Sequence, residues 1–440
     1  MTSPRRIRIG LLGAGVVGQG ILELLRDHAG TIAERLGAPI EVRHVVARDP
    51  NRVRNDLVPK ALLSFDPRVI LDDPEVDVVV EVVGGLEPAG TFLRSAIEGG
   101  RQVVTANKAL LAERGHELIT LAEAKRVDLY FEAAVAGGIP IIRVLREALA
   151  SDRIVALRGI VNGTSNYVLS RMRDAGLAFP DALREAQELG FAEADPTLDV
   201  SGGDAAHKLA ILATLAYGAQ VHLDDVTVEG IDEVTATDVV LARRFGFAIK
   251  PLAVARKLAS GALDLRVHPA LVEETSVLAN ISGALNAVYV EGAMVGPCLL
   301  SGLGAGALPT AMSVVSDIVD VGRNLLTGAR GRVPSRAFRG ESLEPIQVRD
   351  PAEHRTRFYL RIQSHDRPGL LGKIAGVLGA FDVSIEQLVQ EGRGGAEDAP
   401  ITVVMLTHEA PEGAIRGVLR ELAFLPQIVG RPKAIRIEEG

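Results

Sequence analysis

The first third of the chain alternates between short apolar runs and longer segments in which apolar residues recur with helical spacing. The short runs predict strands at residues 7–12, 41–47, 76–83, 102–105 and 128–132. The longer segments predict helices, among them one that opens at residues 13–18 and one at residues 89–98. The run Val78 to Val80 is apolar at successive positions, which is typical of a strand buried on both faces. We therefore expect an α/β fold with a doubly wound parallel sheet.

The pattern changes after residue 150. Strands are predicted at residues 154–161, 252–255, 263–267 and 287–291, and these indicate a second, α+β domain. Residues 292–316 carry no charge, but glycines and prolines interrupt them, so they predict buried loops and strand rather than a membrane span. A helix at residues 310–326 is expected to return to the first domain.

Residues 327–353 have the composition of a linker, with scattered glycines, prolines and arginines. A new pattern of elements then begins. It predicts strands at residues 358–363, 384–389, 402–407 and 434–438, helices at residues 366–378 and 412–422, and a polar loop at residues 391–399. This βαββαβ order is that of a ferredoxin-like domain.

Composition narrows the class of protein. The chain has 440 residues and a formal net charge of -8, which argues against a nucleic-acid partner or an anionic membrane surface. Its single cysteine, Cys298, excludes an internal disulfide framework and fits a reducing compartment. The first six residues lead into a strand without the apolar core of a signal peptide. We expect a cytoplasmic protein without a membrane span.

Three glycines, Gly13, Gly15 and Gly18, follow the first strand and open the first helix, with Val16 and Val17 between them. In this strand–turn–helix context they predict a Rossmann-type dinucleotide site, because glycines let the pyrophosphate approach the amides of the helix start. The second strand ends at Ala47 and is followed by Arg48 and then Asp49. The arginine favours the 2′-phosphate of NADP, with NAD accepted as well. A solvated arginine in this loop is an equally good interpretation.

Two positions carry candidate chemistry. Thr105 ends a predicted strand and Lys108 follows it, at the sheet edge that faces the ligand crevice in open α/β folds. Asp204 and Lys208 are four residues apart, so on a helix they project from the same face. Such a pair is either an exposed ion pair or a proton-transfer device. The apolar run at residues 209–213 argues for a buried helix, which favours the second interpretation.

Several segments resemble successive motifs of homoserine dehydrogenase, in matching order over about residues 5–330. They are residues 105–108, 132–140, 162–167, 193–196, 203–208 and 304–306. Residues 361–371 resemble the opening of an ACT domain, which would cover about residues 355–435. The resemblance implies NAD(P)-dependent interconversion of L-homoserine and L-aspartate 4-semialdehyde in threonine, methionine and isoleucine biosynthesis.

The resemblance also implies residue roles. Lys208 matches the general acid/base, with Asp204 as its partner, and the substrate-binding residues would be Glu193, Asp204 and Lys108. Cofactor contacts would come from Gly13, Gly15, Val16, Val17, Gly18, Ala47, Arg48, Thr105, Lys108, Gly190 and Gly306. A monovalent cation, usually sodium, would be bound by the backbone oxygens of Glu132, Val135, Gly137 and Ile139. From the residues alone, a plain turn is the simpler interpretation of residues 131–140.

The domain limits predicted on this basis are 1–135 plus about 305–327 for the NAD(P)-binding Rossmann domain and 136–304 for the catalytic, substrate-binding and dimerisation domain. A linker at 328–354 and an ACT regulatory domain at 355–440 complete the chain. We expect a homodimer or homotetramer and an amino-acid effector at the ACT domain, L-threonine or another downstream amino acid. A domain that only dimerises is the alternative. Deletion after Val348 is expected to leave catalysis intact and to abolish inhibition.

Two other functions stay open at this point. One is a different NAD(P)-dependent hydroxy-acid or amino-acid dehydrogenase with an amino-acid-sensing ACT domain, and the other is a non-catalytic sensor. The acid/base lysine argues against a sensor. A semialdehyde dehydrogenase of the acylating kind is disfavoured, because it needs a cysteine nucleophile and Cys298 lies in no activating sequence context.

Overall fold

A computed structural model describes residues 5–51, 56–343, 345–391 and 400–438. The chain divides into two compact units. Unit 1 comprises Met1–Gly163, Asp204–Val226 and Leu285–Ile346, and unit 2 comprises Thr164–Gly203, Thr227–Ala284 and Gln347–Gly440. The limits predicted from the sequence assign residues 136–304 to one domain, whereas the packing divides them between the two units, so the two divisions group the chain differently. Most of the polar loop predicted at residues 391–399 lies outside the described residues.

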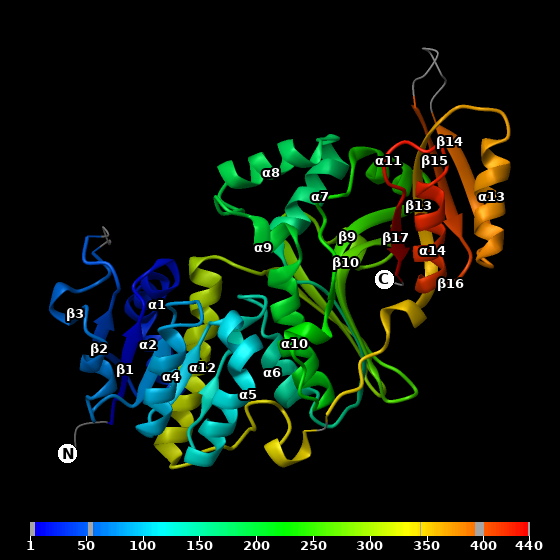
Figure 1. Cartoon of the computed structure of the whole chain (residues 1–440). Coiled ribbons are helices and arrows are strands. Elements are labelled where there is room, and N and C mark those ends of the chain that lie inside the picture. Colours follow the sequence, from blue (N-terminus) through cyan, green and yellow to red (C-terminus); the bar gives the residue numbers. More distant parts are fainter. Residues whose placement is uncertain (1–4, 52–55, 344, 392–399, 439–440) are drawn as a thin grey trace. The chain divides into compact units, whose positions relative to one another are not determined.

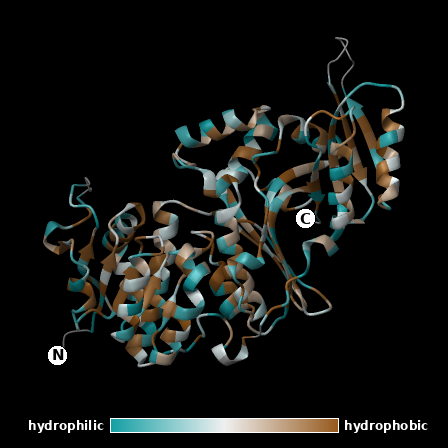
Figure 2. Cartoon of the chain, viewed as in Figure 1, coloured by the Kyte–Doolittle hydropathy of each residue, from teal (hydrophilic) through white to brown (hydrophobic). Residues whose placement is uncertain are grey.

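Unit 1 contains a parallel sheet with strand order β3-β2-β1-β4-β5-β6, which confirms the doubly wound prediction. Its strands are β1 (Ile7–Leu12), β2 (Ile40–Val46), β3 (Leu63–Ser64), β4 (Val78–Glu81), β5 (Gln102–Thr105) and β6 (Leu129–Tyr130). The connections include α1 (Val16–Asp27), α2 (Ala29–Leu36), η1 (Lys60–Leu62), α3 (Arg68–Leu71), α4 (Ala89–Glu98) and α5 (Lys108–Lys125). Figure 1 shows these elements, and Figure 2 shows that apolar residues are concentrated in the strands.

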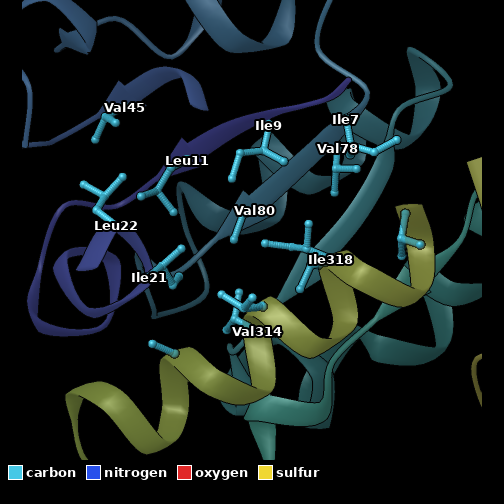
Figure 3. Packing of buried hydrophobic residues seen from close by; sticks show 14 of the residues in the cluster. Ile7, Ile9, Leu11, Ile21, Leu22, Val45, Val78, Val80, Val314 and Ile318 are labelled. Atoms are coloured by element: carbon cyan, nitrogen blue, oxygen red, sulfur yellow. The ribbon is translucent and has the colours of Figure 1, made fainter. Parts of the chain in front are cut away.

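The core of this sheet is closed by a helix from far along the chain. Helix α12 (Ala307–Thr327) places Val314 and Ile318 against Ile9 and Val80, as Figure 3 shows. Helix α1 contributes Ile21 and Leu22 to the same buried cluster. The prediction that a helix at residues 310–326 returns to the first domain is therefore confirmed.

The rest of unit 1 holds a second group of strands. Strands β12 (Gly296–Leu303), β11 (Leu285–Gly292) and β7 (Ile154–Ile160) pair antiparallel in that order. The uncharged residues 292–316 were expected to be buried, and this expectation is wrong for β12, whose Leu299 and Leu303 are exposed. The other elements are η2 (Glu132–Ala134), α6 (Ile141–Arg143), η3 (Val144–Ala148), α10 (Gly203–Tyr217), η4 (Leu223–Asp225) and η6 (Gly340–Ser342).

Unit 2 is built on a sheet with strand order β9-β10-β17-β13-β15-β14. These strands are β9 (Phe247–Lys257), β10 (Leu263–Glu273), β17 (Lys433–Ile437), β13 (Arg355–His365), β15 (Pro400–Thr407) and β14 (Ile385–Glu391), and the short strands β8 (Thr227–Val228) and β16 (Ala410–Pro411) pair with β10 and β13. The helices are α7 (Gly163–Ala175), α8 (Phe179–Glu188), α9 (Thr197–Val200), α11 (Ala236–Arg244), α13 (Leu370–Ala380) and α14 (Glu412–Ala423), with η5 (Leu278–Asn280) and η7 (Pro351–Glu353). The order β13-α13-β14-β15-α14-β17 confirms the ferredoxin-like prediction.

The two faces of the C-terminal strands bury different cores. On one face, Phe358, Leu360 and Val403 pack with residues of α13 and α14. On the other face, Tyr359 and Val404 belong to a cluster with residues of α7, α8, α11, β9 and β10. In addition, β17 pairs in parallel with β10. The C-terminal fold is therefore continuous with the rest of unit 2.

No helix among the described residues has both the length and the apolar character needed to cross a membrane.

Candidate functional site

The glycine turn after β1 combines close packing with open space. A Cβ at Gly18 would lie 2.0 Å from the carbonyl oxygen of Gly13, and Gly13 itself has a φ of 115°. At Gly15, the residue before the first turn of α1, a Cβ would meet nothing within 4 Å. Gly13 and Gly18 are thus required by the local backbone packing. Gly15 leaves space in front of the helix amides, as a dinucleotide site needs.

A buried carboxylate shapes the adjacent edge of the sheet. Glu81, at the end of β4, is fully buried, and its Oε1 accepts the N–H groups of Val83 and Gly84 at 2.7 and 3.0 Å. Its Oε2 accepts the hydroxyl of Thr105 at 2.5 Å. Asn107 caps α5 and donates to the carbonyl of Gly85 at 2.7 Å. Sequence reasoning missed Glu81, although a carboxylate that ends an apolar strand is an available signal.

The loop after β2 holds the cofactor-selecting candidates. Ala47 is buried, whereas Arg48 and Asp49 are exposed. The carboxylate of Asp49 accepts the N–H of Asn51 at 2.8 Å. Asp49 therefore takes part in local loop structure, while Arg48 lies at the surface. NADP selection by Arg48 stays a prediction.

Helix α10 and the start of α5 bring three charged side chains together. Asp204 Oδ2 accepts a hydrogen bond from Lys208 Nζ at 2.6 Å, and Asp204 Oδ1 lies 2.9 Å from Lys108 Nζ. Lys208 Nζ also donates to the carbonyl oxygen of Val161 at 2.6 Å. Asp204 and Lys208 are both buried, whereas the side chain of Lys108 is 38% exposed. The pair predicted at i,i+4 is therefore a buried site and not an ion pair on an exposed helix face.

The electrostatics of this cluster keep the carboxylate ionised. Burial alone would raise the pKa of Asp204, but the ammonium groups of Lys208 and Lys108 hold it well below its usual range. His207, the rival proton acceptor, is also buried, and burial lowers its pKa. Within the described part of the chain, its Nδ1 has no hydrogen-bond partner. Lys208 contacts Asp204 directly, and its role as the proton-transfer group stays a prediction.

The turn that follows β6 is the candidate cation site. Ala136 and Gly137 have positive φ values of 53° and 38°. The carbonyl of Gly137 accepts Ser313 Oγ at 2.6 Å, and that of Ile139 accepts the N–H of Ile141 at 2.8 Å. A carbonyl oxygen has two lone pairs, so each can still bind a hard cation. No group of three or more His, Cys, Asp or Glu side chains that could hold a metal ion occurs among the described residues.

A buried carboxyl pair lies beside this turn. The side chain of Glu132 accepts the N–H groups of Ile142 and Arg143, and its own N–H donates to Asp317 Oδ2 at 2.7 Å. Burial raises the pKa of both Glu132 and Asp317, and the negative charge of Glu132 raises the pKa of Asp317 further. The raised pKa values favour the neutral forms of both carboxyl groups, and a cation bound by the neighbouring carbonyls would favour their ionised forms instead.

Of the remaining predicted residues, Gly306 belongs to unit 1, as the cluster does, whereas Gly190 and Glu193 belong to unit 2. Gly306, with a φ of 125°, precedes α12, and a Cβ at Gly20 of α1 would lie 2.9 Å from the carbonyl of Ala307, so Gly306 is near the nucleotide-binding helix. Gly190 and Glu193 are exposed in the loop after α8, which belongs to unit 2. Gln187 Nε2 donates to the carbonyl of Glu193 at 3.1 Å. Their roles at the cofactor and substrate stay predictions.

Comparison with known proteins places these features in a family. Residues 140–319 match the homoserine dehydrogenase family, and residues 13–132 match its NAD-binding domain. The chain belongs to the homoserine dehydrogenase family, oxidoreductases that act on a CH–OH group. Residues 358–425 match the ACT domain, as the resemblance of residues 361–371 predicted.

Individual homoserine dehydrogenases are similar over the whole length. The enzyme of Neisseria gonorrhoeae is 44% identical, covering 98% of both chains, and that of Bacillus subtilis is 39% identical over 99% of both. The crystal structure of a homoserine dehydrogenase from Thiobacillus denitrificans superposes with a TM-score of 0.93 at 43% identity, covering 99% of each chain. A hyperthermophilic archaeal homoserine dehydrogenase in complex with NADPH has a TM-score of 0.61 at 26% identity and covers 72% of this chain and 98% of its own.

Proposed function

We propose that this chain interconverts L-homoserine and L-aspartate 4-semialdehyde with Lys208 as the general acid/base. The observation that carries the proposal is the buried contact of Lys208 with Asp204, which Lys108 shares. A sensor has no need of a buried lysine on a carboxylate. The free space in front of Gly15, which belongs to the same unit, supports the binding of a dinucleotide there.

When bound, the nicotinamide would accept or donate the hydride of this reaction. The residues of the chain handle the proton. Neutral Lys208 takes the hydroxyl proton of homoserine as the alcohol is oxidised, and protonated Lys208 returns it to the developing alkoxide in the reverse direction. Burial favours the neutral amine, whereas Asp204 favours the ammonium form. Asp204 therefore orients Lys208 and binds the substrate amine, a role in which Glu193 would assist.

The test is NADPH consumption with aspartate semialdehyde. We expect turnover by the wild type and a loss of at least about 100-fold in kcat for Lys208→Ala. His207→Asn is the matched control and should retain activity. An inactive wild type would favour the sensor, activity only on other hydroxy acids would favour a different dehydrogenase, and full activity of Lys208→Ala would move the proton acceptor elsewhere.

NADP is the proposed preferred cofactor, with NAD accepted, because Arg48 is exposed at the end of β2 where the 2′-phosphate would bind. In the Arg48→Ala variant, kcat/KM should fall for NADPH and stay constant for NADH. An unchanged ratio of the two would remove Arg48 from cofactor selection.

Sodium is proposed to bind the backbone oxygens of Glu132, Val135, Gly137 and Ile139. The support is the neutral donor set in a left-handed turn beside a buried carboxyl pair. Sodium should raise the Tm of the protein more than choline does at equal ionic strength, since a specific ligand stabilises the folded state. Equal Tm values would argue against the site.

Assembly and regulation are proposed from two exposed regions. Strand β12 exposes Leu299 and Leu303, and β14 lies at the end of the unit 2 strand order with Leu388 exposed. These surfaces fit a homodimer or homotetramer, since exposed apolar faces and strand edges are typical interaction sites. Gly369, with a φ of 82°, directly precedes α13, and its lack of a side chain would leave the first amides of the helix open to an amino-acid carboxylate.

L-threonine is the proposed effector at this place, and the pathway is the synthesis of threonine, methionine and isoleucine, with the cytoplasm as its compartment. The full-length protein should be inhibited by L-threonine, and Asp366→Ala, in the turn before α13, should weaken inhibition while leaving kcat unchanged. Inhibition of equal strength in both proteins would place the effector elsewhere.

A further inference from the structure

The turn between β7 and α7 contacts both members of the acid/base pair. Val161 and Asn162 are buried and form this turn. The carbonyl of Val161 accepts Lys208 Nζ at 2.6 Å, and the side-chain amide of Asn162 donates to Asp204 Oδ2 at 2.8 Å. Two consecutive residues thus hold the lysine through its nitrogen and its partner through an oxygen.

Three side chains therefore contact the carboxylate of Asp204. Oδ2 accepts both Asn162 and Lys208, and Oδ1 faces Lys108. Only one of the three donors, the amide of Asn162, is uncharged at every pH. It fixes the carboxylate without adding charge to a cluster that already holds two lysines and one carboxylate.

We propose that Asn162 is a positioning residue for the proton-transfer step, which orients Asp204 and, through it, Lys208. The inference rests on the proposed role of Lys208. Without the amide, the two lysines are left as the donors named above, and the carboxylate can rotate towards either of them. Lys208 then leaves the position from which it reaches the substrate oxygen, and misplacement of a reacting group by about 1 Å can cost on the order of 100-fold in rate.

The neutral charge of the amide matters as much as its hydrogen bond. Asn162→Asp keeps the size and shape of the side chain but places a second carboxylate beside Asp204. An additional negative charge at this distance favours the ammonium form of Lys208. Alcohol oxidation needs the neutral amine, so the pH at which activity rises should move upward. In aldehyde reduction, which needs the ammonium form, the alkaline fall in activity should move upward as well.

The experiment compares pH profiles of kcat for homoserine oxidation in the full-length protein. Asn162→Asp should shift the rising limb by about one pH unit or more. Asn162→Ser should lower kcat at least about tenfold, leave the position of the limb unchanged and leave KM for NADP unchanged. If Asn162→Asp does not fold, Asn162→Ser still tests the positioning role.

Asn166, four residues further along the chain and in the first turn of α7, is the matched control. It is buried and donates to the carbonyls of Ile281 and Gly283, which are uncharged. Asn166→Asp should lower the Tm and leave the pH profile in place. The positioning role is contradicted if the pH profile of Asn162→Asp coincides with that of the wild type. It is also contradicted if Asn162→Ser has the kcat of the wild type. If Lys208→Ala is also fully active, the proposed function fails instead.

Discussion

At the scale of single residues, the glycines of the nucleotide-binding turn separate a packing requirement from a ligand requirement. A Cβ at Gly18 would overlap the carbonyl of Gly13, whereas one at Gly15 would project into open space. Gly15→Ala should therefore leave the Tm within about a degree and raise the KM for NADPH at least about tenfold, because the methyl group fills the space in front of the helix amides. Gly18→Ala is the control and should lower the Tm. An unchanged KM in Gly15→Ala would contradict a pyrophosphate at this position.

Lys250 is a buried lysine that is not among the predicted site residues. It lies on β9, is 2% exposed, and its Nζ donates to the carbonyl of Ile281 at 2.6 Å. Burial lowers the pKa of Lys250 to about 7, and the nearby charge of Arg173 acts in the same direction. Between pH 7 and the ordinary pKa of lysine, the unfolded chain therefore binds more protons at this residue than the folded protein. The free energy of unfolding should increase with pH over this range.

The Lys250→Met variant tests this pH dependence. The wild-type free energy of unfolding should rise from pH 7 to pH 9.5 by up to about 1.4 kcal/mol per pH unit from this group alone. The variant lacks the group, so its curve should be flatter by that amount, as measured by urea denaturation at each pH. Parallel curves for the two proteins would show that Lys250 stays protonated in the folded state.

The same scale shows which site residues a sequence can reveal. Asp204 and Lys208 are four residues apart, so helical geometry alone brings them together, and the structure confirms this contact. Asn162 contacts Asp204 across 42 residues, and Glu81 contacts Thr105 across 24. Such contacts depend on how strands and helices are arranged, and nothing in the local spacing predicts them.

At the scale of elements, the sequence predicts strands well where they are apolar throughout. The predicted limits of strands β4 and β5 lie within two residues of those in the structure. Strands β9 and β10 have eleven residues each, yet only residues 252–255 and 263–267 were predicted. Polar residues interrupt their pattern, and in β10 the buried Arg266 is paired with Asp264 and with the distant Glu438. A charge that is satisfied only by a remote partner is indistinguishable from a surface residue in the sequence.

Strand β17 illustrates the same principle with a prediction. Arg436 is buried, and its guanidinium donates to Glu412 at 2.7 and 2.8 Å and to Glu229 at 2.7 Å. Burial alone would raise the pKa of Glu412, but hydrogen bonds from Arg436 and Arg416 lower it to about 2. Arg436→Met should cost about 3–5 kcal/mol in the free energy of unfolding, because it leaves Glu412 buried without its main partner.

Arg416 provides the matched control for this variant. It also contacts Glu412, but its side chain is 54% exposed. Arg416→Met should cost less than about 1 kcal/mol, as exposed ion pairs do. Both values are measured by urea denaturation at pH 7. Equal costs for the two variants would show that burial does not determine the strength of this ion pair.

At the scale of the whole molecule, the C-terminal fold is part of the core of unit 2. Tyr359 and Val404 share one buried cluster with Leu169, Ile249 and Leu271. The last described residue, Glu438, is buried, and its carboxylate pairs with Arg256 and Arg266 while its N–H donates to Leu271. The sequence predicted the ferredoxin-like elements correctly but not this continuity, since the linker-like composition of residues 327–353 indicated a separable module.

Deletion after Val348 should therefore not leave catalysis intact, contrary to the expectation from the sequence. The truncated chain exposes the apolar cluster around Ile249 and Leu271 and leaves the buried Arg266 without Glu438. Removing one partner of a buried ion pair costs about 3–5 kcal/mol, a large part of the total stability of a domain. We expect an aggregating protein without cooperative unfolding and with no measurable NADPH consumption.

Co-expression of the two parts of the chain distinguishes loss of the buried core of unit 2 from loss of regulation. When residues 349–440 are supplied as a separate chain, β17 can pair with β10 again and cover the cluster, so solubility and turnover should return together. The full-length Asp366→Ala variant, in which the core is intact, should keep its kcat throughout. A truncated chain that is soluble and as active as the wild type would show that the shared core is dispensable, and the C-terminal fold would then be the separable regulatory module that the linker composition indicated.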